Sequence, residues 1–243
     1  MKYVVKLRLE QPNFKSDYRR TVISFFKYAI SKYMDGEFYD FLYNSGANQK
    51  SLVWSIRFAE PKFLGENMEL GGTEVEMTLK MSDAQTALVY YSALLEMKGK
   101  AFPVGEGNAL TLEQIKMVRE EKITQPFAMF KVLSPICLKE REEKEQYLSV
   151  EDENFLEEMK RKLRESLPQL SKEIEELKGD FRGLRKTIVR AYGMKIPASV
   201  GTFALAGDVQ ILQYILSSGV GSKRNSGFGL VEFVMRSEER RVG

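Results

Sequence analysis

The chain has 243 residues, 43% of them hydrophobic, and carries 37 basic against 34 acidic side chains. This length suits two compact domains, and the apolar content excludes a disordered tail. The near balance of charge excludes nucleic-acid binding through bulk charge, so any such surface requires clustered cations.

Histidine is absent, and Cys137 is the single cysteine. An internal disulfide, a cysteine-rich zinc site, histidine metal ligation and histidine-based nucleophilic catalysis are therefore excluded. Any catalysis must use tyrosine, lysine, carboxylates or positioning, and we expect neither a metal nor a cofactor. No apolar run approaches membrane-spanning length, and the first residues are typical of a strand and not of a secretory signal. We therefore expect a cytoplasmic protein without a membrane partner.

The first half of the chain alternates strand and helix patterns. Residues 2–10 alternate apolar and polar side chains, which is typical of a half-buried strand. Residues 17–34 place apolar side chains at helical spacing after Asp17, the expected N-cap. The further elements that we expect are a helical turn at 38–42, strands at 51–59, 73–80 and 108–118, and a helix at 82–98 capped by Ser82. This order of strands and helices is the ferredoxin-like order.

The second half repeats the element order without repeating the sequence. The elements that we expect there are a strand within 126–138, a charged loop at 139–152, an amphipathic helix at 153–178 broken at Pro168, strands at 184–192 and 198–204, a helix at 206–217 and a strand at 228–235. The sequence therefore predicts an α+β fold of two tandem ferredoxin-like (βαββαβ, RRM-like) domains. We expect the domains to span residues 1–122 and 123–243.

A glycine-rich segment at residues 219–229 follows the pattern G-x-G-x5-G-x-G around Lys223 and Arg224. Glycine permits positive φ, and successive backbone N–H groups can bind an anion. The segment follows a helix and opens a strand, so it is neither a P-loop nor a dinucleotide fingerprint. It predicts a site for a polyanion such as a nucleic-acid backbone, and the alternative is a surface turn. The candidate contact residues are Gly219, Gly221, Ser222, Lys223, Arg224, Asn225, Gly227 and Gly229.

Four segments together resemble the RAMP superfamily, the repeat-associated mysterious proteins. They are the opening strand Met1 to Glu10, the Ser-Pro element Leu133 to Ile136, the segment Arg190 to Gly193, and the glycine-rich segment followed by Leu-Val-Glu-Phe-Val. Within this superfamily the chain is similar to the CRISPR-associated endoribonucleases that cut precursor CRISPR RNA within its repeats.

The resemblance implies a metal-independent reaction on CRISPR repeat RNA. A ribose 2′-hydroxyl attacks the adjacent phosphate and leaves a 2′,3′-cyclic phosphate and a 5′-hydroxyl. Subunits of a CRISPR effector complex are the further partners that it implies, and it leaves open whether the protein is a monomer or a homodimer.

The resemblance also places candidate catalytic residues. Tyr43 stands where many members carry a catalytic histidine, Lys50 follows it, and Tyr28 lies where some members carry a catalytic tyrosine. Tyrosine is mostly protonated at neutral pH, so it can donate a proton but is a poor base. Surface packing remains the alternative for both tyrosines. The missing histidine favours a second function, a cleavage-deficient RNA-binding subunit.

A basic cluster surrounds the expected strand at 184–192. Arg185 and Lys186, together with Arg182 and Arg190, can follow RNA phosphates, where a cationic groove dominates affinity. Alternatively these side chains pair with the acidic helix that precedes them.

Overall fold

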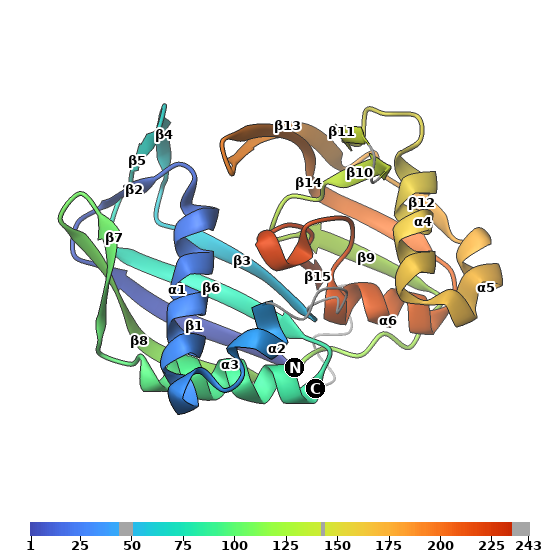
Figure 1. Cartoon of the computed structure of the whole chain (residues 1–243). Helices are drawn as coiled ribbons and strands as arrows, with labels where there is room; N and C mark the ends of the chain where they lie inside the picture. The colour runs from blue at the N-terminus through green and yellow to red at the C-terminus, as the bar shows by residue number, and fades with distance from the viewer. Residues whose placement is uncertain (44–50, 142–143, 235–243) are drawn as a thin grey trace, which may run out of the picture. The chain divides into compact units, whose positions relative to one another are not determined.

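The structure, a computed structural model, describes residues 1–43, 51–141 and 144–234 (Figure 1). It divides into two compact units: Met1–Arg119 with Arg190–Lys195, and Glu120–Val189 with the chain from Ile196 onward. The division falls near the expected boundary between residues 122 and 123, but Arg190–Lys195 groups with the first unit.

The first unit contains an antiparallel sheet in the order β3-β6-β1-β8-β7. Its strands are β1 (Lys2–Leu9), β3 (Leu52–Phe58), β6 (Glu74–Met81), β7 (Ala101–Gly105) and β8 (Asn108–Val118), and its helices are α1 (Tyr18–Lys32), α2 (Tyr39–Tyr43) and α3 (Ala84–Glu96), with a 3-10 turn at Tyr33–Gly36. Without β7, this is the order of strands in a ferredoxin-like fold. The strand β7 was missed because it pairs only with its hairpin partner β8.

Alternation along β1 sets which face of this sheet is covered. Tyr3, Val5 and Leu7 are buried in a core that they share with α1 and α3. Both helices lie on the same face of the sheet (Figure 1). Trp54 of β3 and Tyr90 of α3 are fully buried in that core, and burying a large apolar side chain contributes about 1.5–3 kcal/mol.

The helix starts differ in part from those expected. Asp83, and not Ser82, caps α3: its carboxylate accepts a hydrogen bond from the Thr86 N–H at 2.6 Å. Interaction with the Thr86 hydroxyl, together with this N–H, stabilises the charged form and lowers the pKa of Asp83. Asp17 precedes α1 as expected, but its side chain makes no capping hydrogen bond.

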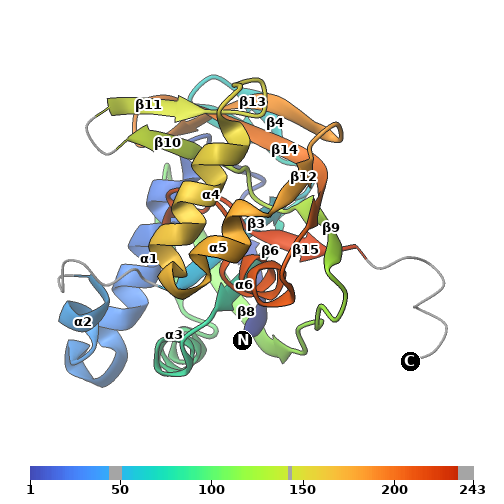
Figure 2. The same ribbon diagram turned by 90° about the vertical axis from the view of Figure 1, so that its right-hand side faces the viewer.

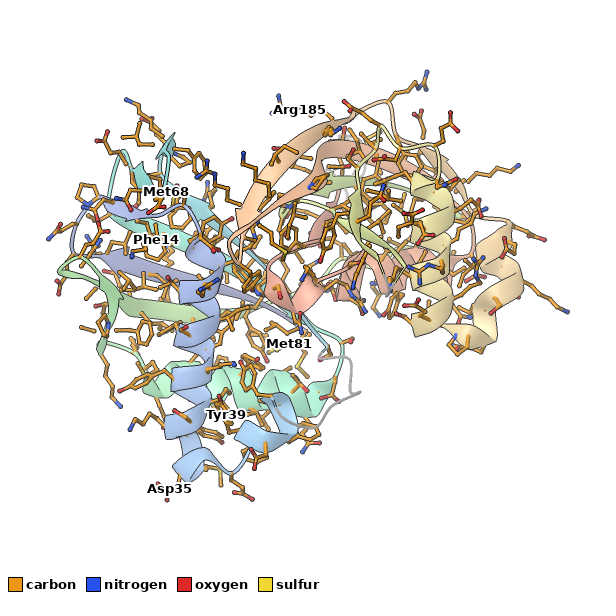
Figure 3. All side chains as sticks on the ribbon, turned by 45° about the horizontal axis from the view of Figure 1, so that its top comes forward. Phe14, Asp35, Tyr39, Met68, Met81 and Arg185 are labelled. Atoms are coloured by element: carbon orange, nitrogen blue, oxygen red, sulfur yellow. The ribbon has the colours of Figure 1, made fainter. Side chains whose placement is uncertain are left out.

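Three short strands form a separate sheet in the order β2-β5-β4. They are β2 (Asn13–Lys15), β4 (Lys62–Leu64) and β5 (Asn67–Glu69). Phe14 and Met68 pair across β2 and β5, and both are buried (Figure 3). Each strand has only three residues, too few for a period-two pattern to be visible in the sequence.

The second unit has a sheet in the order β12-β14-β9-β15, with β13 also paired to β14. Its elements are β9 (Phe127–Val132), α4 (Phe155–Ser166), a 3-10 turn at Pro168–Leu170, α5 (Ser171–Glu175), β12 (Lys178–Asp180), β13 (Leu184–Ala191), β14 (Met194–Ala206), α6 (Val209–Ser218), a 3-10 turn at Arg224–Ser226 and β15 (Val231–Phe233). The helices α4 and α6 share one core with this sheet (Figure 2). The ferredoxin-like arrangement is therefore present in both units.

The segment at 139–152 contradicts the expected loop. It contains an antiparallel hairpin of β10 (Leu138–Arg141) and β11 (Lys144–Leu148). The hairpin was missed because its chain is rich in charged residues, so the strand alternation has little apolar content to reveal it. The break at Pro168 is confirmed, since α4 ends at Ser166.

Candidate functional site

The glycine-rich segment leaves the end of α6 and turns repeatedly through positive φ. Gly219 donates its N–H to the Ile215 carbonyl at 2.9 Å, which closes the helix. The φ angles of Gly219, Gly221, Gly227 and Gly229 are 75°, 89°, 82° and 74°. Glycine adopts these conformations at no steric cost, whereas a side chain opposes them.

Backbone donors of the segment bind the protein itself. Ser222 donates its N–H to the Cys137 carbonyl at 2.8 Å, and Gly229 donates to the Pro135 carbonyl at 2.9 Å. Leu230 donates to the buried Ser134 Oγ at 2.9 Å. At these positions the expectation of exposed N–H groups around an anion is wrong. The contacts instead join the Ser-Pro element to the glycine-rich segment, two motifs that the resemblance singled out separately.

Two glycines are required because backbones approach closely. A Cβ atom on Gly221 would lie 2.6 Å from the Cys137 carbonyl oxygen, and one on Gly229 would lie 1.9 Å from the Val220 carbonyl oxygen. These glycines therefore hold the shape of the segment, independently of any ligand.

Arg224 is bound within its own unit. Its guanidinium donates to the Tyr214 hydroxyl at 2.9 Å and to the Ser218 carbonyl at 3.2 Å, and lies over the Tyr214 ring at 5.7 Å. A cation beside the last carbonyls of α6 complements the helix dipole. These contacts give Arg224 a structural role, and its role toward RNA stays a prediction.

Lys223 is oriented differently from Arg224. Its backbone is left-handed, with φ 56° and ψ 31°, and its ammonium lies 5.6 Å from the ring centroid of Tyr147 on β11. Ser222 and Asn225, on either side of the two cations, are half-buried. Lys223 is thus the candidate cation of this segment that approaches the hairpin.

The basic cluster on β13 is partly neutralised by nearby acids. Lys186 pairs with Glu151 at 2.9 Å, which raises the pKa of the lysine, and Arg182 pairs with Asp180 on β12. The alternative that these two residues pair with the acidic helix is therefore wrong. Such exposed pairs contribute little to stability. Arg185 is exposed on β13 (Figure 3).

Tyr43 lies at the end of α2 and contacts α3. Its hydroxyl is 2.7 Å from the hydroxyl of Tyr90, and its ring lies 5.2 Å from that of Tyr39. Burial raises the pKa of Tyr43 above its usual range and raises the pKa of Tyr90 to about 12. Both hydroxyls are protonated at neutral pH, as an ordinary tyrosine is, and the raised pKa makes Tyr43 a still poorer source of a base.

The other candidate catalytic residues lie apart from this hydroxyl pair or outside the described part of the chain. Tyr28 is exposed on α1, with its ring 5.5 Å from Phe102 and 5.6 Å from the Lys32 ammonium. Lys50 lies outside the described residues. The ammonium of Lys27 lies 5.3 Å from the Tyr43 ring centroid. Helical spacing alone does not reveal this contact, because Lys27 and Tyr43 belong to different helices.

We expect the buried tyrosine pair to make the protein sensitive to alkali. The unfolded chain releases tyrosine protons near pH 10, whereas the folded pKa values are higher, so this stability is complete below pH 10 and is lost as pH rises from about 10 toward 12. At pH 11 the loss is on the order of 1 kcal/mol for each tyrosine. Urea unfolding at pH 9 and pH 11 measures it. Tyr90→Phe should reduce the difference, and an equal pH dependence in both proteins would refute the assignment.

Comparison with known proteins identifies the class. Residues 118–233 match the family model described as CRISPR associated protein Cas6, C-terminal. This part of the chain is therefore a Cas6 C-terminal domain, and the resemblance inferred from the sequence is confirmed. No curated protein sequence matches the chain significantly.

Solved structures share the fold over nearly the whole chain. A RAMP protein described as binding different RNA substrates is 19% identical, with TM-score 0.78, covering 97% of this chain and 100% of its own. A Cas6-related protein from Pyrococcus furiosus is 18% identical, with TM-score 0.79 and coverages of 98% and 99%. A Thermus thermophilus Cas6 product complex is 18% identical, with TM-score 0.71 and coverages of 96% and 99%. The predicted α+β class of tandem ferredoxin-like domains is confirmed.

Two features are absent from the residues that the structure describes. These residues contain no helix that is long and apolar enough to cross a membrane. They also contain no group of three or more acidic or cysteine side chains that could hold a metal ion.

Proposed function

We propose that the protein binds CRISPR repeat RNA and cleaves it without a metal, by attack of a 2′-hydroxyl on the adjacent phosphate. The observation that carries this proposal is the contact between the Ser-Pro element and the glycine-rich segment in the Cas6 C-terminal domain. Leu230 donates its N–H to the Ser134 hydroxyl, and Gly229 donates its N–H to the Pro135 carbonyl. This contact fixes the glycine-rich segment in front of β15, with Lys223 on its surface. Lys50, and Lys27 beside Tyr43, would stabilise charge on the pentavalent phosphate.

Incubation with the protein's own repeat RNA in EDTA tests this function. A product ending in a 2′,3′-cyclic phosphate supports the endoribonuclease. Tight binding without product supports the second candidate, a cleavage-deficient RNA-binding subunit. That candidate is favoured by the hydrogen bond between Tyr43 and Tyr90, because it engages the Tyr43 hydroxyl inside the first unit. Failure to bind any RNA at low salt would refute both.

The two cations of the glycine-rich segment should respond differently to substitution. Lys223→Ala should weaken repeat binding and reduce the slope of log affinity against log salt by about 0.7, the value for one phosphate contact on a single strand. Arg224→Ala should instead mainly lower the free energy of unfolding, because it removes hydrogen bonds to Tyr214 and Ser218. Filter binding at several salt concentrations, with urea unfolding of each variant, measures both effects. Equal salt slopes in wild type and Lys223→Ala would show that Lys223 makes no phosphate contact.

A further inference from the structure

The hairpin β10–β11 adjoins the glycine-rich segment through a continuous set of contacts. Ser222 donates its N–H to the Cys137 carbonyl at 2.8 Å, and Ser222 Oγ accepts from the Lys139 N–H at 3.0 Å. Cys137 Sγ donates to the Ser222 carbonyl at 3.4 Å. Three hydrogen bonds therefore join the start of β10 to the residue before Lys223.

The hairpin is also held from its other side. The Arg161 guanidinium on α4 donates to the Lys139 carbonyl at 2.8 Å and to the Glu140 carbonyl at 3.1 Å. Arg161 is in turn paired with Glu158 at 2.7 Å. Anchoring by a helix on one side and by the glycine-rich segment on the other leaves β10 little freedom to move.

One aromatic side chain of the hairpin, Tyr147, lies beside the Lys223 ammonium. Lys139 and Tyr147 are directly opposite each other across the antiparallel pair, so their side chains share one face of the hairpin. The Lys223 ammonium lies 5.6 Å from the centroid of the Tyr147 ring, within the range of a cation–π contact. All three side chains are half-buried and not freely solvated.

We propose that Tyr147 positions Lys223 for a phosphate of single-stranded repeat RNA, and that Lys139 adds positive charge at the same nucleotide. This rests on the proposed RNA-binding function and adds the hairpin to that site. Tyr147 acts through its ring face: it holds the flexible lysine stem in one place, which reduces the conformational entropy lost when the phosphate binds. The left-handed backbone at Lys223 directs the side chain to the ring.

The chemistry favours RNA over an acidic protein surface. An ammonium group beside an aromatic ring, with a second lysine on the same face of the hairpin, combines the phosphate contact and the stacking surface by which proteins bind single-stranded nucleic acids. An acidic peptide offers charge but no base to contact the ring. Competition by poly-glutamate as strong as competition by unrelated RNA would therefore contradict the proposal.

A double-mutant cycle on the full chain tests the positioning role. Tyr147→Leu should weaken repeat binding about 2- to 5-fold, the range of a partly exposed cation–π contact, whereas Tyr147→Phe should bind like wild type because it keeps the ring. Lys223→Ala should weaken binding more, and adding Tyr147→Leu to it should weaken binding no further. The matched control is Gln146→Ala, since Gln146 is exposed and faces the other side of β11.

The outcomes separate this proposal from the proposed function. If wild type binds repeat RNA and Tyr147→Leu binds equally well, or if the effects of Tyr147→Leu and Lys223→Ala simply add, the positioning role is wrong and the RNA-binding function stands. If Tyr147→Phe is as weak as Tyr147→Leu, the ring face is not the cause and the proposal is wrong. If wild type binds no RNA, both fail. Equal melting temperatures of the Leu and Phe variants exclude unfolding of the hairpin as the cause.

Discussion

Gly229→Ala should destabilise the second unit by about 2–5 kcal/mol. A non-glycine residue in the left-handed region costs about 1–2 kcal/mol, and Gly229 has φ 74°. The new Cβ would also lie 1.9 Å from the Val220 carbonyl oxygen, which is closer than van der Waals contact allows. The backbone must therefore shift, at about 1–3 kcal/mol for an overpacked site. Urea unfolding followed by circular dichroism measures the loss.

Gly107→Ala is the control for backbone conformation alone. Gly107 has φ 70°, but a Cβ there would meet no atom within 4 Å. Its substitution should cost about 1–2 kcal/mol, the conformational part only. If Gly229→Ala costs no more than Gly107→Ala, then the segment near Val220 relaxes freely, and the close packing of the glycine-rich segment is not what fixes its shape.

Local patterns in the sequence predicted the fold well. The alternation in β1 and the spacing in α1 and α3 follow from which side chains must be buried, and this information is contained within each element. The glycines at 219, 221, 227 and 229 likewise predicted positive φ. The hairpin β10–β11 was missed because it contributes little apolar surface, and its pairing is visible only in three dimensions.

The candidate site was harder to predict because its contacts join distant parts of the chain. Nothing near residue 224 in the sequence shows that Arg224 binds the end of α6, or that backbone donors of the segment are used by residues 134–137. Similarly, the partner of Tyr43 is Tyr90, on a helix 47 residues away. A motif thus predicted where the chain turns sharply, but not which of its groups remain available to a ligand.

The largest expected effect on activity comes from Tyr43→His. A tyrosine hydroxyl is protonated at neutral pH, and burial raises the pKa of Tyr43 further, so it supplies no base. An imidazole, whose ordinary pKa is near neutrality, would supply a base at this position and should raise the single-turnover cleavage rate about 10²-fold, the low end for general acid–base catalysis. The rate is measured in EDTA at saturating enzyme, so that differences in affinity do not contribute.

The control variants test position and chemistry separately. Tyr39→His places an imidazole one helical turn earlier on α2, so it should leave the rate unchanged if residue 43 alone faces the phosphate. A substrate with a 2′-deoxy nucleotide before the cut should bind every variant and remain whole, because the nucleophile is missing. Lys50→Ala should slow cleavage more than it weakens binding, as expected for a charge that acts mainly on the transition state. If Tyr43→His and Tyr43→Phe both cleave at the wild-type rate, then Tyr43 lies outside the active site, and its hydrogen bond to Tyr90 serves only to join α2 to α3.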